Sequence, residues 1–345
     1  MAKIPAPPEK LIEASGKPNY GIFTGPIPQV NLDDYDYMGN GRFPFNIAQG
    51  LSKLALRRWQ YIGVFDEEYV IGVAVVNIGF TGSAFAYVYN RATKVKTEIN
   101  LIDPGARNSV FSPDSMNGFS MLRKERNSVR IDAPDADGMR MVTVDSDKLK
   151  LKLAVEDAPD RVTPMGICCR IGLRRFNYTH KVAGLPASGE IVLGGETLHL
   201  SHKALGVFDW TAGVPNRETF WNWASAAGRL DDGQVVALNF GRGLNESAVT
   251  ENVFWVDGKP EWVGMVHFDY DHKNLQGPWK LTSNDGLVDL EFTPEGERAE
   301  EINMLLVRSN FHQPFGKFTG TLKKGTKKIK IDDMFGFVEE HYVKW

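Results

Sequence analysis

Trp59-Gln-Tyr-Ile-Gly-Val-Phe-Asp-Glu-Glu-Tyr-Val-Ile-Gly-Val-Ala-Val-Val-Asn-Ile-Gly79 and Trp221-Asn-Trp-Ala-Ser-Ala-Ala-Gly-Arg-Leu-Asp-Asp-Gly-Gln-Val-Val-Ala-Leu-Asn-Phe-Gly241 are the two stretches that decide the fold. In both, an asparagine follows the first tryptophan by 18 residues, and a glycine follows that asparagine by two. Each stretch has an acidic turn at its centre, flanked by the apolar runs and period-two alternation of β-strands. We interpret them as two copies of one β-hairpin unit, which predicts two similar β domains in tandem.

The rest of the chain also favours strands over helices, because apolar residues recur with a period of two and seldom with a helical period. Further strands are predicted over Ala84–Asn90, Arg140–Val144, Leu149–Val155, Gln234–Phe240, Asn252–Val256, Glu261–Phe268, Leu287–Phe292 and Lys328–Ile331. Asp-Gly pairs such as Asp257-Gly258 mark tight hairpins. Residues 297–307 fit a helix or a hairpin arm equally well. The prediction is an all-β chain of antiparallel strands.

Length and composition agree with two soluble domains. The chain has 345 residues, with 42% hydrophobic and 24% charged residues. We expect domains over 1–170 and 171–345, with the boundary in the turn-rich region 156–190. Forty basic residues against 43 acidic ones give a net charge of -3, which argues against a dedicated nucleic-acid binder. The longest near-apolar run is too short to span a bilayer and no signal core opens the chain, so we expect a cytoplasmic protein.

The second copy of the repeat begins within a longer stretch that is distinctive enough to compare with known families. This stretch runs from Leu205-Gly-Val-Phe-Asp-Trp-Thr-Ala-Gly-Val-Pro-Asn-Arg through Trp221 to Gly228. Together with Gln313-Pro-Phe-Gly-Lys-Phe-Thr-Gly320 and the terminal Gly336-Phe-Val-Glu-Glu-His-Tyr-Val-Lys-Trp345, it resembles the domain of unknown function 2804 family. That family is similar to the two-domain lipocalin-like (calycin) proteins that include carotenoid 1,2-hydratase and tocopherol cyclase. The resemblance implies two tandem lipocalin-like antiparallel β-barrels and assigns no reaction.

Four carboxylic acids are candidate catalytic groups: Asp209, Glu246, Glu251 and Glu340. Desolvation beside aromatic rings in a closed cavity raises the pKa of a carboxyl group, which can then exchange a proton with an alkene or a carbon acid. If Arg217 instead pairs with Asp209, that acid is structural. The terminal strand places Glu339 and His341 on one face and Glu340 on the other, so only one of these two glutamates can form a dyad with the histidine.

Aromatic residues concentrate in the second half of the chain, which holds seven of the eight tryptophans. We therefore expect an apolar cavity lined chiefly by the second domain. The candidate ligand-binding residues are Trp210, Arg217, Trp221, Trp223 and Asn239. Alternation puts Trp221 and Trp223 on one strand face, opposite Asn222. The equivalent residues of the first copy, Trp59 and Asn77, are expected to serve packing in the first domain.

Two functions follow from these patterns and from the resemblance: a cofactor-independent enzyme of the hydratase, cyclase or isomerase type acting on a lipophilic, isoprenoid-like substrate, or a non-catalytic binding protein for lipids. No dinucleotide fingerprint or Walker loop is present, so we expect no cofactor. We expect no metal site either, although His267, Asp269 and Asp271 share a strand face. The sequence does not decide the oligomeric state.

Two local features have alternative interpretations. Cys168 and Cys169 are adjacent, which makes a structural disulfide between them improbable. The alternatives are two strand residues that face opposite sides, or a vicinal pair with a redox or soft-metal role. A basic run contains Lys323, Lys324, Lys327 and Lys328. Lysines at a hairpin are typical of a solvated sheet edge, and the functional alternative is peripheral contact with anionic lipid headgroups.

Overall fold

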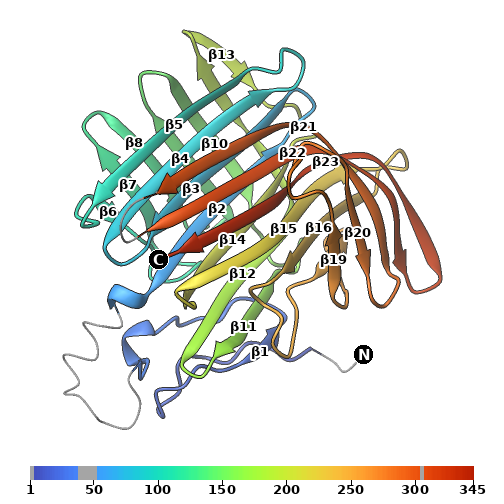
Figure 1. The fold of residues 1–345 in the computed structure, drawn as a ribbon. Coiled ribbons are helices and arrows are strands. Elements are labelled where there is room, and N and C mark those ends of the chain that lie inside the picture. The colour runs from blue at the N-terminus through green and yellow to red at the C-terminus, as the bar shows by residue number, and fades with distance from the viewer. Residues whose placement is uncertain (1–3, 38–52, 304–306) are drawn as a thin grey trace.

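A computed structural model describes residues 4–37, 53–303 and 307–345 of the chain. Its described residues form a 14-stranded sheet and a nine-stranded sheet, both antiparallel (Figure 1). Apart from strands, a 3-10 turn, η1, covers Leu32–Asp34. The prediction of an all-β chain with two tandem lipocalin-like barrels is confirmed, since the first sheet curls into a nearly closed barrel and the second into a half-barrel.

The first sheet contains the strands of residues 21–214. Its main path, in spatial order, is β5 (Lys96–Pro104), β4 (Thr81–Asn90), β3 (Tyr69–Asn77), β2 (Arg57–Phe65), β14 (Leu205–Val214), β12 (Arg175–Leu193), β10 (Leu149–Glu156), β9 (Met139–Asp145), β8 (Asn127–Asp132), β7 (Phe119–Lys124) and β6 (Ser109–Val110). Off this path, β1 (Gly21–Phe23) pairs with β11 (Met165–Gly172), and β11 and β13 (Glu196–His199) both pair with β12.

The second sheet contains the strands of residues 218–344. Its spatial order is β18 (Lys259–Trp262), β17 (Val253–Val256), β16 (Val235–Arg242), β15 (Glu218–Arg229), β23 (Lys327–Lys344), β22 (Arg308–Lys324), β21 (Val288–Asn303), β20 (Trp279–Ser283) and β19 (Val266–Asp269). The chain thus changes sheet between residues 214 and 218. The division into domains at 170/171 stays a prediction, and strands β12 and β14, which follow it in the chain, belong to the first sheet.

The sequence repeat is a structural repeat. Strands β2, β3 and β4 form consecutive hairpins, as do β15, β16 and β17. In each sheet the first strand of the repeat also pairs with a later strand, β2 with β14 and β15 with β23. The Asp257-Gly258 turn after β17 has positive φ at both residues, 50° and 75°, as the hairpin signal predicts.

Two sequence expectations change in the structure. The predicted strand over residues 261–268 is wrong, because β18 and β19 lie at opposite edges of the second sheet. The break falls at Gly264, where a Cβ would come within 2.1 Å of Asn284 Oδ1. The segment 297–307, for which a helix and a hairpin arm stayed open, is strand β21 as far as Asn303.

The two sheets pack against each other through the faces that carry the odd-numbered residues of β2 and β15. Tyr61 contacts Trp223 and Phe337 edge-on at ring-centroid distances of 5.6 and 5.7 Å. On the other face of β15, Ala224 and Ala226 belong to a separate core inside the second sheet. The aromatic surface predicted for the second half is therefore an interface between the two barrels.

Candidate functional site

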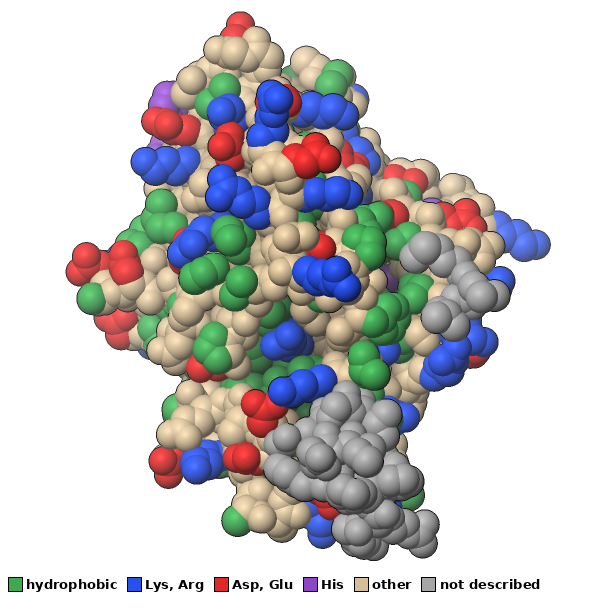
Figure 2. Space-filling view, turned by 90° about the vertical axis from the view of Figure 1, so that its left-hand side faces the viewer, with side chains coloured by type: hydrophobic (Ala, Val, Ile, Leu, Met, Phe, Trp, Pro, Cys, Tyr) green, Lys and Arg blue, Asp and Glu red, His purple; other side chains and the backbone are tan. Residues whose placement is uncertain are grey.

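A cavity of about 200 Å³ lies at the interface between the two sheets. Strands β2, β3, β4, β12 and β14 line it from the first sheet, and β15, β21, β22 and β23 from the second. Its aromatic and aliphatic walls include Trp59, Tyr61, Val76, Phe85, Trp221, Trp223, Phe311, Val343 and Trp345. The C-terminus lies on the left-hand side of Figure 1, and on that face Figure 2 shows hydrophobic side chains around a hollow.

Two tryptophans at equivalent positions of the repeat stack on each other in this cavity. The rings of Trp59 and Trp221 are nearly parallel, at 3°, with centroids 6.1 Å apart. Each indole N–H donates to a carboxylate oxygen of its own sheet, Trp59 to Asp209 Oδ2 at 3.1 Å and Trp221 to Glu339 Oε1 at 2.7 Å. The tryptophan pair thus holds one acid from each barrel at the cavity wall.

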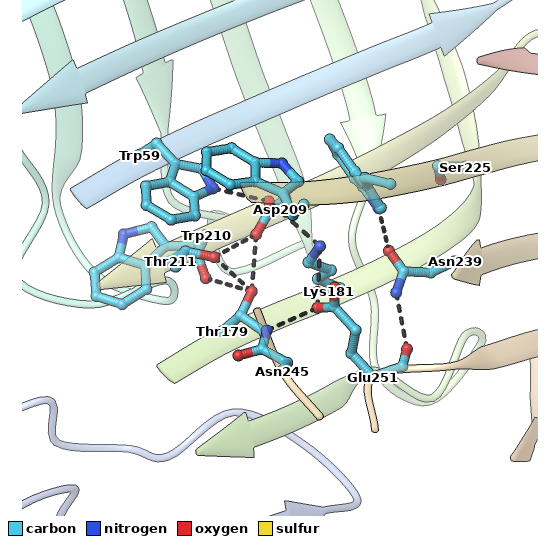
Figure 3. Close-up of polar contacts among 12 residues, drawn as sticks. Trp59, Thr179, Lys181, Asp209, Trp210, Thr211, Ser225, Asn239, Asn245 and Glu251 are labelled. Carbon is cyan, nitrogen blue, oxygen red and sulfur yellow. Dashed lines mark hydrogen bonds and ion pairs between the residues drawn. The ribbon is translucent and has the colours of Figure 1, made fainter. Parts of the chain in front are cut away.

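Asp209, on β14, is 2% exposed and surrounded by donors. The hydroxyls of Thr179 and Thr211 both donate to Oδ1 at 2.8 Å. Lys181 Nζ lies 3.6 Å from Oδ2 (Figure 3). Together with the indole N–H of Trp59, these groups give both oxygens of Asp209 a partner.

Lys181 is a buried cation at the centre of the polar wall. Besides Asp209, its Nζ contacts Glu251 Oε2 at 3.2 Å and lies 4.2 Å from the centroid of the Trp223 ring. Burial opposes the charge, but the two carboxylates outweigh it and raise the pKa of the ammonium group. Lys181 is therefore a fixed positive charge between two acids (Figure 3), unsuited to act as a neutral amine nucleophile.

Glu251 reaches this cluster from the loop between β16 and β17. Asn245 donates to its Oε2 at 3.1 Å and is itself held by Asn177 at 3.0 Å. The glutamate packs directly over Gly241, where an added Cβ would lie 1.9 Å from Oε1. The glycine that recurs in the repeat is thus needed here for the close approach of a charged side chain.

Glu339, on β23, is 4% exposed and has a different environment. Burial raises its pKa to about 7, although hydrogen bonds from Trp221 and Gln313 and the charge of Lys181 act in the opposite direction. Gln313 Nε2 donates to Oε2 at 3.1 Å, and its amide orientation is set by Tyr87, whose hydroxyl donates to Gln313 Oε1 at 2.8 Å. Glu339 can therefore gain or lose a proton near neutral pH.

His341 lies next to Glu339 on the same strand face, with 4.0 Å between its Nδ1 and Oε1 of the glutamate. Its Nε2 is 2.9 Å from the Ser309 hydroxyl. Burial, helped by the charge of Arg298, lowers its pKa to about 3, so the ring is neutral. The face shared by Glu339 and His341 is the one that turns to the cavity, but at 4.0 Å the two groups form no hydrogen bond, so no dyad is made.

The predicted site residues divide into those at the cavity and those away from it. Asp209, Glu251, Trp221 and Trp223 line the cavity. Asn239 lies one layer behind, where its Oδ1 accepts the indole N–H of Trp223 at 2.7 Å and its Nδ2 donates to the Glu251 carbonyl. Their roles in catalysis or binding stay predictions.

The other four predicted residues lie elsewhere. Glu340 faces away from the cavity and accepts hydrogen bonds from Tyr270 at 2.5 Å and His272 at 2.8 Å. Glu246 accepts the N–H of Gly243 within its own loop, beside a separate hollow. Trp210 packs on the opposite face of β14 from Asp209, with its indole N–H on Ser112. Arg217 is exposed, and the cation beside Asp209 is Lys181.

Trp59 does more than the packing in the first domain that was expected of it, because it lines the cavity, stacks on Trp221 of the second sheet and donates to Asp209. Asn77 does close a turn, accepting the Gly79 N–H at 3.0 Å. Lys181 and Gln313 did not appear among the predicted site residues, and neither did Glu339 as a catalytic group. One signal was present in the sequence: Gly206-Val-Phe-Asp209 and Gly336-Phe-Val-Glu339 share a glycine, two apolar residues and an acid.

The structure also shows the surroundings of the cysteine pair and of the basic run, whose contact with lipid headgroups stays a prediction. Cys168 and Cys169 are free and buried, and burial raises the pKa of the Cys169 thiol to about 12, so both are unreactive strand residues. No group of three or more His, Cys, Asp or Glu among the described residues could hold a metal ion.

In the basic run, Lys324 pairs with Glu261. None of the described helices is long and apolar enough to cross a membrane.

Fold and cavity together define a protein of two tandem lipocalin-like barrels. The chain belongs to the DUF2804 family, a domain of unknown function whose model matches residues 2–345. Kievitone hydratase from Nectria haematococca has a similar structure, with a TM-score of 0.56 and 13% identity over 83% of this chain and 88% of that one. The structure of CghA with Sch210972 is also similar, with a TM-score of 0.57 and 13% sequence identity over 98% of this chain and 97% of that one. Comparison with curated proteins found no match.

Proposed function

We propose that this protein is an enzyme of the hydratase, cyclase or isomerase type, which acts without a cofactor on a lipophilic small molecule held between its two barrels. The observation that carries the proposal is the burial of Lys181, Asp209, Glu251 and Glu339 in the wall of an aromatic cavity. Burying ionisable groups is costly for a folded protein even when they are paired. A lipid carrier needs only the apolar walls, whereas proton transfer needs the acids.

The similar structures support this proposal without deciding it. One of them is named a hydratase, and another was solved with the small molecule Sch210972. In this chain, the faces of Trp59 and Trp221 offer a flat apolar surface beside two acids, which suits a substrate with an apolar body and one reactive double bond or carbonyl group.

The test starts from small molecules extracted from the natively purified protein and identified by mass spectrometry. Each recovered compound, and its close analogues, is then incubated with wild type, Asp209→Asn and the surface control Asp332→Asn. Turnover in the wild type and the control that is lost in folded Asp209→Asn supports the enzyme. A ligand that is always recovered unchanged supports the alternative, a binding protein for lipids.

A further inference from the structure

Asp209 and Glu339 occupy equivalent positions in the two barrels. Tyr61 and Trp223 correspond in the repeat, since each follows its first tryptophan by two residues. Asp209 pairs with Tyr61 across β14 and β2, and Glu339 pairs with Trp223 across β23 and β15. The two acids also accept indole N–H groups from the equivalent, mutually stacked tryptophans.

The neighbour on the other side of each acid differs. On β12, Lys181 is opposite Asp209. On β22, the register that pairs His312 with Glu340 and Phe315 with Phe337 puts Gln313 opposite Glu339. Gln313 donates a hydrogen bond, as the lysine would, but brings no charge. The repeat has thus kept two carboxyl groups and given only one of them a cation.

The two hydrogen-bond partners of Glu339 cannot take a proton from it, and the glutamate lines the cavity. Both of its oxygens accept from N–H donors, of Trp221 and Gln313, and neither donor can accept a proton in return. Tyr87 holds the Gln313 oxygen on the far side. A ligand that offers an electron pair is therefore the natural acceptor for the O–H of Glu339.

We propose that the two equivalent acids have divided their roles: Glu339 is the proton donor of the active site, and Asp209, paired with Lys181, is the acid that stabilises the positive charge formed on the substrate. This inference rests on the proposed function and names its catalytic acid. Two carboxyl groups whose environments separate their protonation states are a recurrent basis for such a division.

The step balances with one proton and, for hydration, one water. The O–H bond of Glu339 breaks, and the π-electron pair of a substrate double bond forms the new bond to hydrogen. The cationic centre then takes the oxygen lone pair of a water molecule, or loses a proton from a neighbouring carbon. The proton released in either case returns to Glu339, so the acid is regenerated. The substrate class is an apolar molecule with a polarised double bond.

Carbon-13 NMR of protein labelled at the glutamate carboxyl carbons tests the division without any substrate. Ionisable groups from five strands interact with Glu339, and each must be considered: Tyr61, Tyr87, Lys181, Asp209 and His341. Arg298 acts in turn on His341. One glutamate should titrate near pH 7, in line with the pKa raised by burial. Its signal should be missing in Glu339→Gln and present in Glu340→Gln, the neighbour on the opposite face.

Two variants test the cause of the division. Gln313→Lys supplies the missing cation and should lower the apparent pKa of Glu339 by about one to three units. Asp209→Asn removes a negative charge that raises this pKa and should lower it as well, so either variant suffices if the other does not fold. A folded protein without a glutamate titrating near pH 7, or a signal unmoved by both variants, would overturn the inference.

A readout with substrate separates this inference from the proposed function. On any substrate found, Glu339→Gln should lower kcat by about 10²- to 10⁴-fold, and wild-type kcat/KM should fall as the pH rises through about 7. If Glu339 titrates near pH 7 but no substrate is turned over, the proposed enzymatic function is wrong and the difference between the two acids is still supported. If Glu339→Gln retains turnover, Glu339 is not the proton donor, whereas the proposed enzymatic function is supported.

Discussion

Replacing Glu339 by glutamine should increase the stability of the protein relative to wild type progressively as the pH rises. The pKa of this carboxyl is raised by burial from 4.5 to about 7 in the folded protein. Between these values the unfolded chain loses the proton and the folded chain keeps it, so wild-type stability falls as the pH increases. One pKa unit corresponds to about 1.4 kcal/mol, so the full effect is about 3 kcal/mol.

About 2 kcal/mol of this effect lies between about pH 5.5 and about pH 8.5, the range we would measure. Urea unfolding of both proteins, followed by tryptophan fluorescence, gives the free energy of unfolding at each pH. The buried histidines titrate alike in both proteins and cancel in the difference. Any constant cost of placing the substituted amide against the Gln313 amide also leaves the trend intact.

The difference in unfolding free energy, variant minus wild type, should therefore rise with pH by about 2 kcal/mol over that range. A difference that stays flat or falls as the pH rises would refute the buried, protonated state of Glu339.

Three further substitutions test other parts of the structure by urea unfolding. His180 is buried, both of its ring nitrogens lack a described partner, and burial lowers its pKa from 6.5 to about 4, so wild-type stability falls as the pH drops below about 6.5. His180→Leu should reduce that slope by about 1.4 kcal/mol per pH unit, and an unchanged slope would contradict the reasoning. Gly241→Ala should cost about 1–3 kcal/mol by displacing Glu251, whereas Gly25→Ala, with nothing near its Cβ, should cost less than about 0.5; equal costs would count against the close contact. Trp59→Phe removes a donor from the Asp209 carboxylate and should cost about 1.5–3 kcal/mol, and a neutral result would argue against that bond.

The hairpins of the repeat could be predicted because each has apolar residues with a strand pattern and an acidic turn. Strand β14 could not, although it is central to both the first sheet and the site. All ten of its residues are buried, since its two faces pack on the barrel interior and on the second sheet. Burial on both faces removes the alternation on which strand prediction depends.

The sequence predicted a site of acids among aromatic residues, but it identified only some of the residues that form it. Acids among aromatic residues marked Asp209 and Glu251, but their cation, Lys181, comes from another strand and is placed by register that no local pattern reports. Alternation separated Glu339 from Glu340 without saying which one faces the cavity. That choice depends on how the two barrels pack, and the sequence encodes it only through contacts between distant strands.

Solvent deuterium tests the central claim, an enzyme that protonates a lipophilic substrate in the cavity, most directly. The native protein is incubated in deuterium oxide with a mixture of apolar small molecules extracted from its host cells, and the mixture is analysed by mass spectrometry. We expect at least one compound to acquire carbon-bound deuterium, or the mass of added heavy water, with wild type and with Asp332→Asn. We expect neither change with Glu339→Gln or Asp209→Asn. A compound that binds the wild-type protein and is always recovered without deuterium would contradict the claim and identify a carrier.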